Sequence, residues 1–171
     1  MHDRAKVTIR VAAPREIAFE VFTAEIDGWW RHGRKYRCAE PSTMALEPRA
    51  GGRLTETFEA GGKVTRRTIG EVLEWSPPKR LIFTWRAANF EEADPSTVVE
   101  VTFERAIGHS GEGTLVTLEH RDWSRVRPDH PARHGQAPDA FLSATGRWWG
   151  DLLTALRERL AMRSTGAAPG E

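Results

Sequence analysis

The sequence predicts an α+β protein in which a long C-terminal helix packs across a curved antiparallel sheet. The chain has 171 residues, a length that one hydrophobic core organises as a single domain. Short segments of alternating apolar residues recur between turns rich in glycine and proline. The chain then closes with apolar residues at three- and four-residue steps. We expect residues 1–163 to form one domain and residues 164–171 to form a flexible tail.

The N-terminal part predicts one strand followed by two short helices. Residues 6–12 alternate between apolar and polar side chains, which is the period of a half-buried strand. Pro14 suits the first turn of a helix, because its fixed φ matches that position. Thr23 is a suitable cap for a second short helix that ends near residues 28–30. Residues 31–43 show no period and predict a loop.

Six further strands follow, joined by turns that contain glycine or proline and therefore favour antiparallel hairpins. Their expected ranges are 44–48, 53–59, 63–75, 81–85, 97–103 and 114–120. Residues 121–137 carry no period and predict a long loop, which is a candidate lid because loops of this length are often functional. Pro138 opens the strongest helical pattern, whose apolar positions include Phe141, Trp148, Trp149, Leu152, Leu153, Leu156 and Leu160.

Composition and charge exclude several functional classes. The 25 basic and 24 acidic residues nearly cancel, which argues against binding of nucleic acid or anionic lipid by the field of the whole protein. No stretch approaches the roughly 18 apolar residues of a membrane span. The N-terminus lacks the apolar core of a signal peptide, so we expect a cytoplasmic protein. Cys38 is the only cysteine, which rules out an intramolecular disulfide.

Motifs for cofactors and metals are weak. No glycine-rich phosphate loop follows a strand and opens a helix, so we expect no cofactor. His130 and His134 have the four-residue spacing of two metal ligands on a helix. Pro131 and Gly135 argue against a helix there, and we expect no metal site. The basic residues between 31 and 37 suggest phosphate contact, but a solvated loop explains them better.

Four segments carry a resemblance to a known family. They are Phe22 to Trp30, the turn Pro48-Arg49-Ala50-Gly51-Gly52, the run from Gly70-Glu71-Val72-Leu73-Glu74 through Pro77-Pro78-Lys79-Arg80-Leu81 to Thr84-Trp85, and Thr114 to His120. Together they resemble homologues of the activator of the 90-kDa heat-shock-protein ATPase, within the START-like, birch-pollen-allergen-like (SRPBCC) superfamily. The resemblance covers roughly residues 6–162. It implies a helix-grip fold, a seven-stranded sheet around the C-terminal helix with a cavity between them, and functions that range from lipid or polyketide binding to cyclisation and co-chaperone action.

Aromatic residues are the first candidates for the lining of such a cavity. Tryptophan combines a large apolar surface with one N–H group, and aromatic walls with few polar groups are typical of small-molecule sites. The tryptophans considered are Trp29, Trp30, Trp85, Trp123, Trp148 and Trp149. Trp29 and Trp148 either line the cavity or fill the core. Gly146 and Gly150 in the helix either allow close backbone packing or leave space for a ligand.

Polar candidates lie on the strands and in the first loop. His120 shares a strand face with Val116 and Leu118, so it is either a general base or ligand anchor in an apolar wall, or a structural histidine. Glu56 and Arg66 lie on adjacent strands and form either a polar pair in the cavity or a solvated pair. The hydroxyl of Tyr36 either orients a ligand or faces solvent. The predicted ligand contacts are Trp29, Trp30, Tyr36, Glu56, Phe58, Arg66, Trp85, His120, Phe141 and Trp148.

Three functional hypotheses follow from these patterns. The leading one is binding of a small hydrophobic or aromatic ligand between the sheet and the C-terminal helix. The second is a cyclase- or hydrolase-like enzyme that uses His120 with a nearby carboxylate such as Glu56. The third is a chaperone-associated stress-response protein that works through partner or homodimer contacts, for which no specific sequence signal exists.

Overall fold

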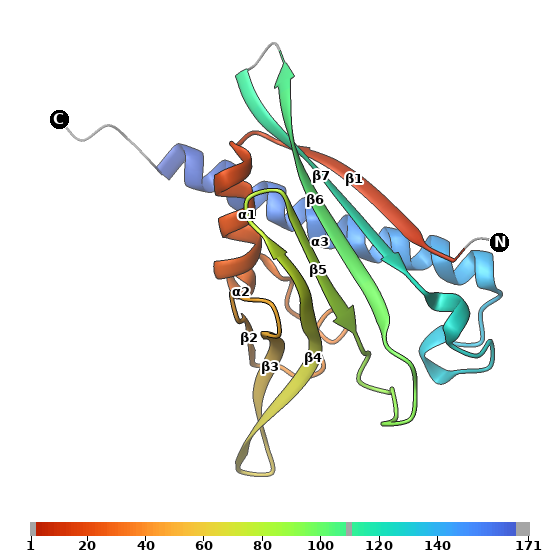
Figure 1. Cartoon of the computed structure of the whole chain (residues 1–171). Helices are drawn as coiled ribbons and strands as arrows, with labels where there is room; N and C mark the ends of the chain where they lie inside the picture. Colours follow the sequence, from red (N-terminus) through yellow and green to blue (C-terminus); the bar gives the residue numbers. More distant parts are fainter. Residues whose placement is uncertain (1–2, 109–110, 167–171) are drawn as a thin grey trace.

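The computed structural model describes residues 3–108 and 111–166 and shows one antiparallel sheet with helices on one side (Figure 1). The strands are β1 (Ala5–Val11), β2 (Ser42–Leu46), β3 (Arg53–Ala60), β4 (Lys63–Ser76), β5 (Arg80–Trp85), β6 (Thr97–Gly108) and β7 (Gly111–Arg121). The helices are α1 (Arg15–Ala24), α2 (Ile26–Trp29) and α3 (Pro138–Gly166). The sheet order is β1-β7-β6-β5-β4-β3-β2. The predicted α+β helix-grip fold with seven strands is confirmed.

The long helix α3 runs along the curved sheet, and α1 and α2 lie beside its C-terminal half (Figure 1). All the apolar positions that the sequence pattern predicts after Trp148 and Trp149 are buried in the structure. The fully buried side chains of α3 include Trp149, Leu152, Leu153, Leu156 and Leu160. They pack against inward-facing residues of the central strands, such as Val101 and Leu118. The apolar periodicity of this segment therefore reports its packing face.

A glycine in β4 allows the sheet to bend close to its neighbouring strand. A Cβ atom on Gly70 would lie 1.6 Å from the carbonyl oxygen of Thr84, a distance that no side chain tolerates. The register of β4 shifts nearby, between Leu54 and Thr55 on one side and between Val72 and Glu74 on the other. Such irregularities increase the local bend of a strand. Gly70 thus contributes to the curvature that wraps the sheet around α3.

Three local expectations differ from the structure. Thr23 does not cap α2, because its hydroxyl donates to the carbonyl of Phe19 at 2.8 Å inside α1, and Glu25 occupies the capping position. The segment 121–137 contains two short 3-10 turns, Trp123–Arg125 and Pro131–Arg133, where we expected only an irregular loop. Helix α3 continues to Gly166, beyond the expected start of the tail, and residues 167–171 lie outside the described part.

Within residues 3–108 and 111–166, no helix is both long enough and apolar enough to cross a membrane.

Candidate functional site

Tryptophan side chains fill the middle of the core between the sheet and α3. Trp30 and Trp149 are almost completely buried, and their ring centroids lie 5.6 Å apart in an edge-to-face arrangement. Trp29 packs against Trp30 at 5.5 Å and donates its indole N–H to the carbonyl of Phe22 at 3.1 Å. The N–H group of Trp29 is therefore satisfied inside the core. Trp29 belongs to the core and not to a cavity wall.

Open space remains beside the N-terminal half of α3, in a pocket of about 360 Å³ that we call the aromatic pocket. Its lining comes from the ends of β5 and β7, the segment 121–137 and α3. The lining residues are Lys35, Trp85, Ala87, His120, Trp123, His134, Gln136, Phe141, Ala144, Thr145, Trp148 and Trp149. The volume lies within the range of roughly 300–1,000 Å³ that is usual for small-molecule sites.

A second pocket of about 350 Å³, which we call the polar pocket, adjoins the first. Its walls include the first loop, β3, β4 and the segment after β5. The lining residues are Trp30, Arg34, Lys35, Tyr36, Arg37, Cys38, Glu56, Arg67, Ile69, Trp85, Ala87, Ala88, Asn89, Ala132 and His134. The two pockets share Lys35, Trp85, Ala87 and His134, so one side has aromatic walls and the other carries charged groups.

His120 is buried in the wall of the aromatic pocket with both ring nitrogens engaged. The indole N–H of Trp149 donates to Nδ1 at 3.1 Å, which places the imidazole proton on Nε2. Nε2 then donates to the hydroxyl of Thr97 at 2.7 Å, and that hydroxyl donates to the carbonyl of Trp85 at 3.2 Å. Burial lowers the pKa of His120 from 6.5 to about 3. His120 is therefore neutral at physiological pH and fully occupied by neighbouring groups.

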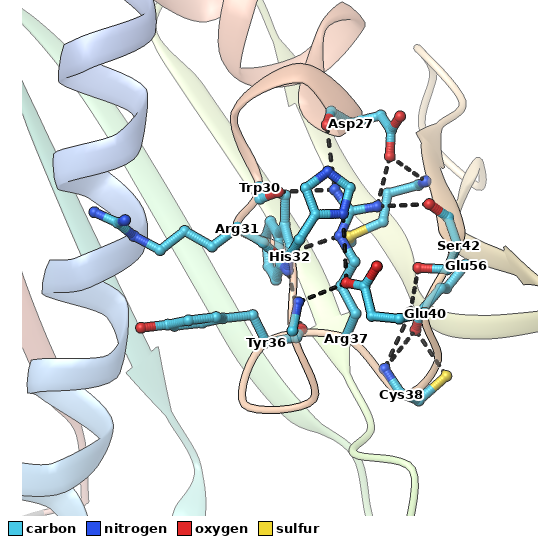
Figure 2. Close-up of polar contacts among 12 residues, drawn as sticks. Asp27, Trp30, Arg31, His32, Tyr36, Arg37, Cys38, Glu40, Ser42 and Glu56 are labelled. Atoms are coloured by element: carbon cyan, nitrogen blue, oxygen red, sulfur yellow. Dashed lines mark hydrogen bonds and ion pairs between the residues drawn. The ribbon is translucent and has the colours of Figure 1, made fainter.

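Glu56 is the buried carboxylate of the polar pocket, and donors surround it (Figure 2). Its Oε1 accepts from the Ser42 hydroxyl at 2.8 Å and from the backbone N–H of Cys38 at 3.0 Å. Its Oε2 accepts from the Cys38 thiol at 2.8 Å. Burial, together with the adjacent Glu56 carboxylate, raises the pKa of Cys38 to about 11. The thiol thus stays protonated and acts as a donor.

The arginine that approaches Glu56 is Arg67 and not Arg66. The register of β3 and β4 pairs Glu56 with Arg67, whose Nη1 lies 3.9 Å from Oε2. Arg66 pairs with Thr57 and is exposed. Since neighbouring residues of a strand point to opposite faces, Arg66 projects away from the pocket. The expected pair of Glu56 with Arg66 is wrong by one position.

Arg37 holds the first loop in shape from inside the protein (Figure 2). Its side chain is completely buried, and Nη1 donates to the Asp27 carboxylate at 2.7 Å and to the carbonyl of Ser42 at 2.8 Å. Nη2 donates to the carbonyl of Trp30 at 2.7 Å, and Nε donates to that of Arg31 at 3.2 Å. The guanidinium satisfies carbonyl groups that a loop without regular structure would leave unpaired.

The same loop is fastened to α3 by contacts that converge on Asp151, which we call the Asp151 clasp. Tyr36 donates its hydroxyl to Oδ2 at 3.0 Å, and the Lys35 ammonium lies 3.2 Å from the same oxygen. Arg31 donates to the backbone carbonyl of Asp151 at 2.8 Å, and the indole of Trp148 donates to the carbonyl of Lys35 at 2.7 Å. In Figure 2, Arg31 and Tyr36 extend toward α3. The hydrogen bonds from Lys35 and Tyr36 lower the pKa of Asp151.

The segment 121–137 covers the other side of the aromatic pocket and has a small core of its own. Trp123 and Phe141 pack edge to face with centroids 4.7 Å apart. Arg133 is buried and donates to the carbonyl of Val126 at 2.8 Å. His130 donates through Nε2 to the Asp94 carboxylate at 2.8 Å, because its Nδ1 accepts from a backbone N–H. The segment is therefore held by buried side chains at Trp123, Val126, His130 and Arg133, whereas residues 134–137 are exposed.

Seven of the ten predicted ligand contacts line the two pockets: Trp30, Tyr36, Glu56, Trp85, His120, Phe141 and Trp148. Trp29, Phe58 and Arg66 do not line either pocket. Tyr36 is half-buried and bonded to Asp151, where we expected either a ligand-orienting group or an exposed one. The sequence pattern indicates Trp123 and Trp149 as aromatic candidates without selecting them, and it misses Cys38 and Arg67.

The two histidines of the 121–137 segment lie in different surroundings. His130 bonds to Asp94, whereas His134 is exposed. Among residues 3–108 and 111–166, no three His, Cys, Asp or Glu side chains are grouped so as to hold a metal ion.

Comparison with solved structures supports the helix-grip assignment. A protein from Cytophaga hutchinsonii has a TM-score of 0.64 at 16% identity, with 96% of this chain and 99% of that chain covered. The Aha1 dimer from Colwellia psychrerythraea has a TM-score of 0.59 at 17% identity, with 93% and 96% covered. The anthrahydroquino-gamma-pyrone synthase Txn09, complexed with SUM, is 33% identical, with a TM-score of 0.50 and coverage of 72% of this chain and 79% of that chain.

No curated protein matches the sequence closely enough to count as a relative. The family model of the Activator of Hsp90 ATPase homolog 1-like proteins matches residues 12–161, which is most of the chain. The matched residues include every strand of the sheet except β1, together with all residues that line the two pockets. On this match, the chain belongs to the Activator of Hsp90 ATPase homolog 1-like family.

Proposed function

We propose that the protein binds a small aromatic molecule in the joined aromatic and polar pockets beside the N-terminal half of α3. The observation that carries this proposal is the composition of the aromatic pocket, which has four tryptophans and one phenylalanine in its wall: Trp85, Trp123, Trp148, Trp149 and Phe141. Flat apolar side chains favour flat apolar ligands, because ring stacking adds to the gain from burial of apolar surface.

The likeness to Txn09 supports the same class of ligand. The name of that synthase refers to a fused-ring aromatic compound, and its 33% identity exceeds that of the Cytophaga and Colwellia structures. Fold likeness alone does not transfer a reaction from one protein to another. The proposed ligand is therefore a fused-ring aromatic molecule.

The contacts of His120 and Glu56 favour binding over the enzyme hypothesis. A general base needs a free lone pair within hydrogen-bond reach of substrate. Nδ1 of His120 accepts from Trp149, and its Nε2 carries the proton that bonds Thr97. Glu56 bonds Cys38 and Ser42 in the other pocket. The two groups therefore serve separate networks.

Calorimetric titration with 2-naphthol and with a dihydroxyanthraquinone tests the proposal. Trp148→Leu removes one wall of the aromatic pocket and should weaken binding by about tenfold, through lost apolar contact area. Trp75→Leu is the matched control, because Trp75 is also half-buried and packs on Phe19 outside both pockets. It should leave affinity within about twofold.

Two results would count against the proposal. One is an absence of heat and of thermal shift with both probes. The other is equal weakening by Trp148→Leu and Trp75→Leu, which would place binding outside the aromatic pocket. Native mass spectrometry of protein purified from its own host gives an independent check, since a retained small molecule would report the natural ligand. If calorimetry, thermal shift and native mass spectrometry all show no bound ligand, the interaction hypothesis is favoured.

A further inference from the structure

The polar pocket contains one cationic donor that is held in place and still has hydrogen-bonding capacity. Arg67 donates from Nη2 to the backbone carbonyl of Arg86, which anchors the guanidinium between β4 and the segment after β5. Its Nη1 lies 3.9 Å from Glu56, which is beyond hydrogen-bond distance. Within residues 3–108 and 111–166, Nη1 has no hydrogen-bond partner. The anchored guanidinium thus presents N–H groups beside the pocket that its own side chain lines.

The other charged side chains that line the polar pocket are either already paired or, in the case of Arg34, exposed to solvent. Glu56 accepts from Cys38 and Ser42, so it has little need of a hydrogen bond from Arg67. Arg37 donates its hydrogen bonds to Asp27 and to backbone carbonyls. Lys35 faces Asp151 in the clasp. Arg67 is consequently the half-buried cation of this wall with capacity for a new acceptor.

We infer that the polar end of the aromatic ligand is a carbonyl or carboxylate oxygen that accepts a hydrogen bond from Nη1 of Arg67. The two pockets share Trp85, Ala87 and Lys35, so a ring system in the aromatic pocket places a substituent next to the polar pocket. Charged donors form the stronger class of hydrogen bonds, and a guanidinium suits planar oxygen acceptors. This inference rests on the proposed function and adds the chemical class of the ligand's polar group.

Three probes of similar shape separate the possible acceptors: 2-naphthoate, 2-acetonaphthone and 2-isopropylnaphthalene. They present a charged oxygen acceptor, a neutral oxygen acceptor and no acceptor. Calorimetry should show that Arg67→Gln weakens one or both oxygen-bearing probes by about 10-fold or more, while 2-isopropylnaphthalene changes by less than about twofold. A loss for 2-naphthoate alone identifies an oxyanion, and a loss for both identifies a carbonyl oxygen as sufficient.

Arg66→Gln provides the matched control, since the neighbouring arginine has the same charge and points to the opposite face of β4. It should leave the affinities of all three probes unchanged. Arg67→Lys should recover part of the affinity for 2-naphthoate, because it restores the charge without the planar fork. Thermal unfolding of each variant shows whether loss of the Arg86 contact has changed the fold.

The outcomes separate this inference from the function on which it rests. Equal effects of Arg67→Gln on all three probes, or effects no larger than those of Arg66→Gln, would overturn the role of Arg67 and leave aromatic binding standing. If no probe binds the unsubstituted protein, the proposed function fails first.

Discussion

The indole N–H of Trp149 donates to Nδ1 of His120 at 3.1 Å, which joins α3 to the end of β7 through a buried hydrogen bond. The bond fixes the tautomer of the imidazole and directs its proton to Thr97. Burial favours the neutral form, and the pKa of His120 falls to about 3. Protonation of His120 at Nδ1 would remove the acceptor of Trp149 and break this hydrogen bond between the helix and the sheet.

Acid should destabilise the protein through this histidine. The unfolded chain binds a proton at His120 near pH 6.5, whereas the folded state binds it only near pH 3, so stability is present above pH 6.5 and is lost as pH falls toward 3. Between pH 7 and pH 5 the loss from this one group is about 2 kcal/mol. Urea unfolding of the wild type and of His120→Gln at both pH values should show that difference. Identical acid sensitivity of the two proteins would contradict it.

Replacement of the buried Arg37 should destabilise the first loop. Arg37→Met keeps an unbranched side chain as far as the position of Nε, but it leaves Asp27 and the carbonyls of Trp30 and Ser42 without their donor. We expect a loss of about 3 kcal/mol in the free energy of unfolding, because removal of one partner strands buried polar groups. Arg34→Met in the same loop is the control, since Arg34 is exposed, and it should change stability by less than about 0.5 kcal/mol.

Much of the fold was predictable because its signals are local. Alternation marks the strands, and the apolar stripe of α3 marks its buried face. The pairing of Glu56 with Arg67 could also be predicted from the sequence, through the position of the turn. Gly61 and Gly62 form a two-residue turn in which Ala60 pairs with Lys63, and counting back from that pair places Arg67 opposite Glu56.

Other features of the site depend on contacts between distant segments, which no local pattern encodes. The Asp151 clasp joins residues more than a hundred positions apart. Phe58 has the same strand parity as the buried Glu56, but it lies nearer the end of the hairpin and is only half-buried. Parity predicts which face a side chain occupies, whereas its depth depends on what covers that face.

The two glycines of α3 should tolerate alanine, in contrast to Gly70. A Cβ atom on Gly146 or Gly150 meets nothing within 4 Å, so neither glycine serves close backbone packing. Gly150→Ala and Gly146→Ala should each stabilise the protein by about 1 kcal/mol, through better helix propensity. Gly70→Ala should instead destabilise it severely, because its Cβ would collide with Thr84. Thermal melts of the three variants test this order, and destabilisation by both α3 substitutions would refute it.

Loss of the Asp151 clasp should loosen the first loop without unfolding the sheet. Asp151→Ala removes the acceptor of Tyr36 and Lys35 but keeps the backbone carbonyl that Arg31 uses. Both lost contacts are largely exposed, so we expect only a modest loosening of the loop, seen as about fivefold faster hydrogen exchange. The amides of Tyr36 and Arg37, which donate to the carbonyl of Gly33, report it directly.

Glu158→Ala on α3 is the matched control for the clasp, because Glu158 is an exposed acid of the same helix. It should leave exchange at Tyr36 and Arg37 unchanged. The amides of β6 and β7 should keep their protection in both variants, since their partners lie within the sheet. Hydrogen bonds from Lys35 and Tyr36 lower the pKa of Asp151, so the carboxylate should stay ionised, and the clasp closed, below the usual pKa of an aspartate. Faster exchange across the whole sheet in Asp151→Ala would contradict this prediction, because it would show that the clasp stabilises the whole fold and not only the first loop.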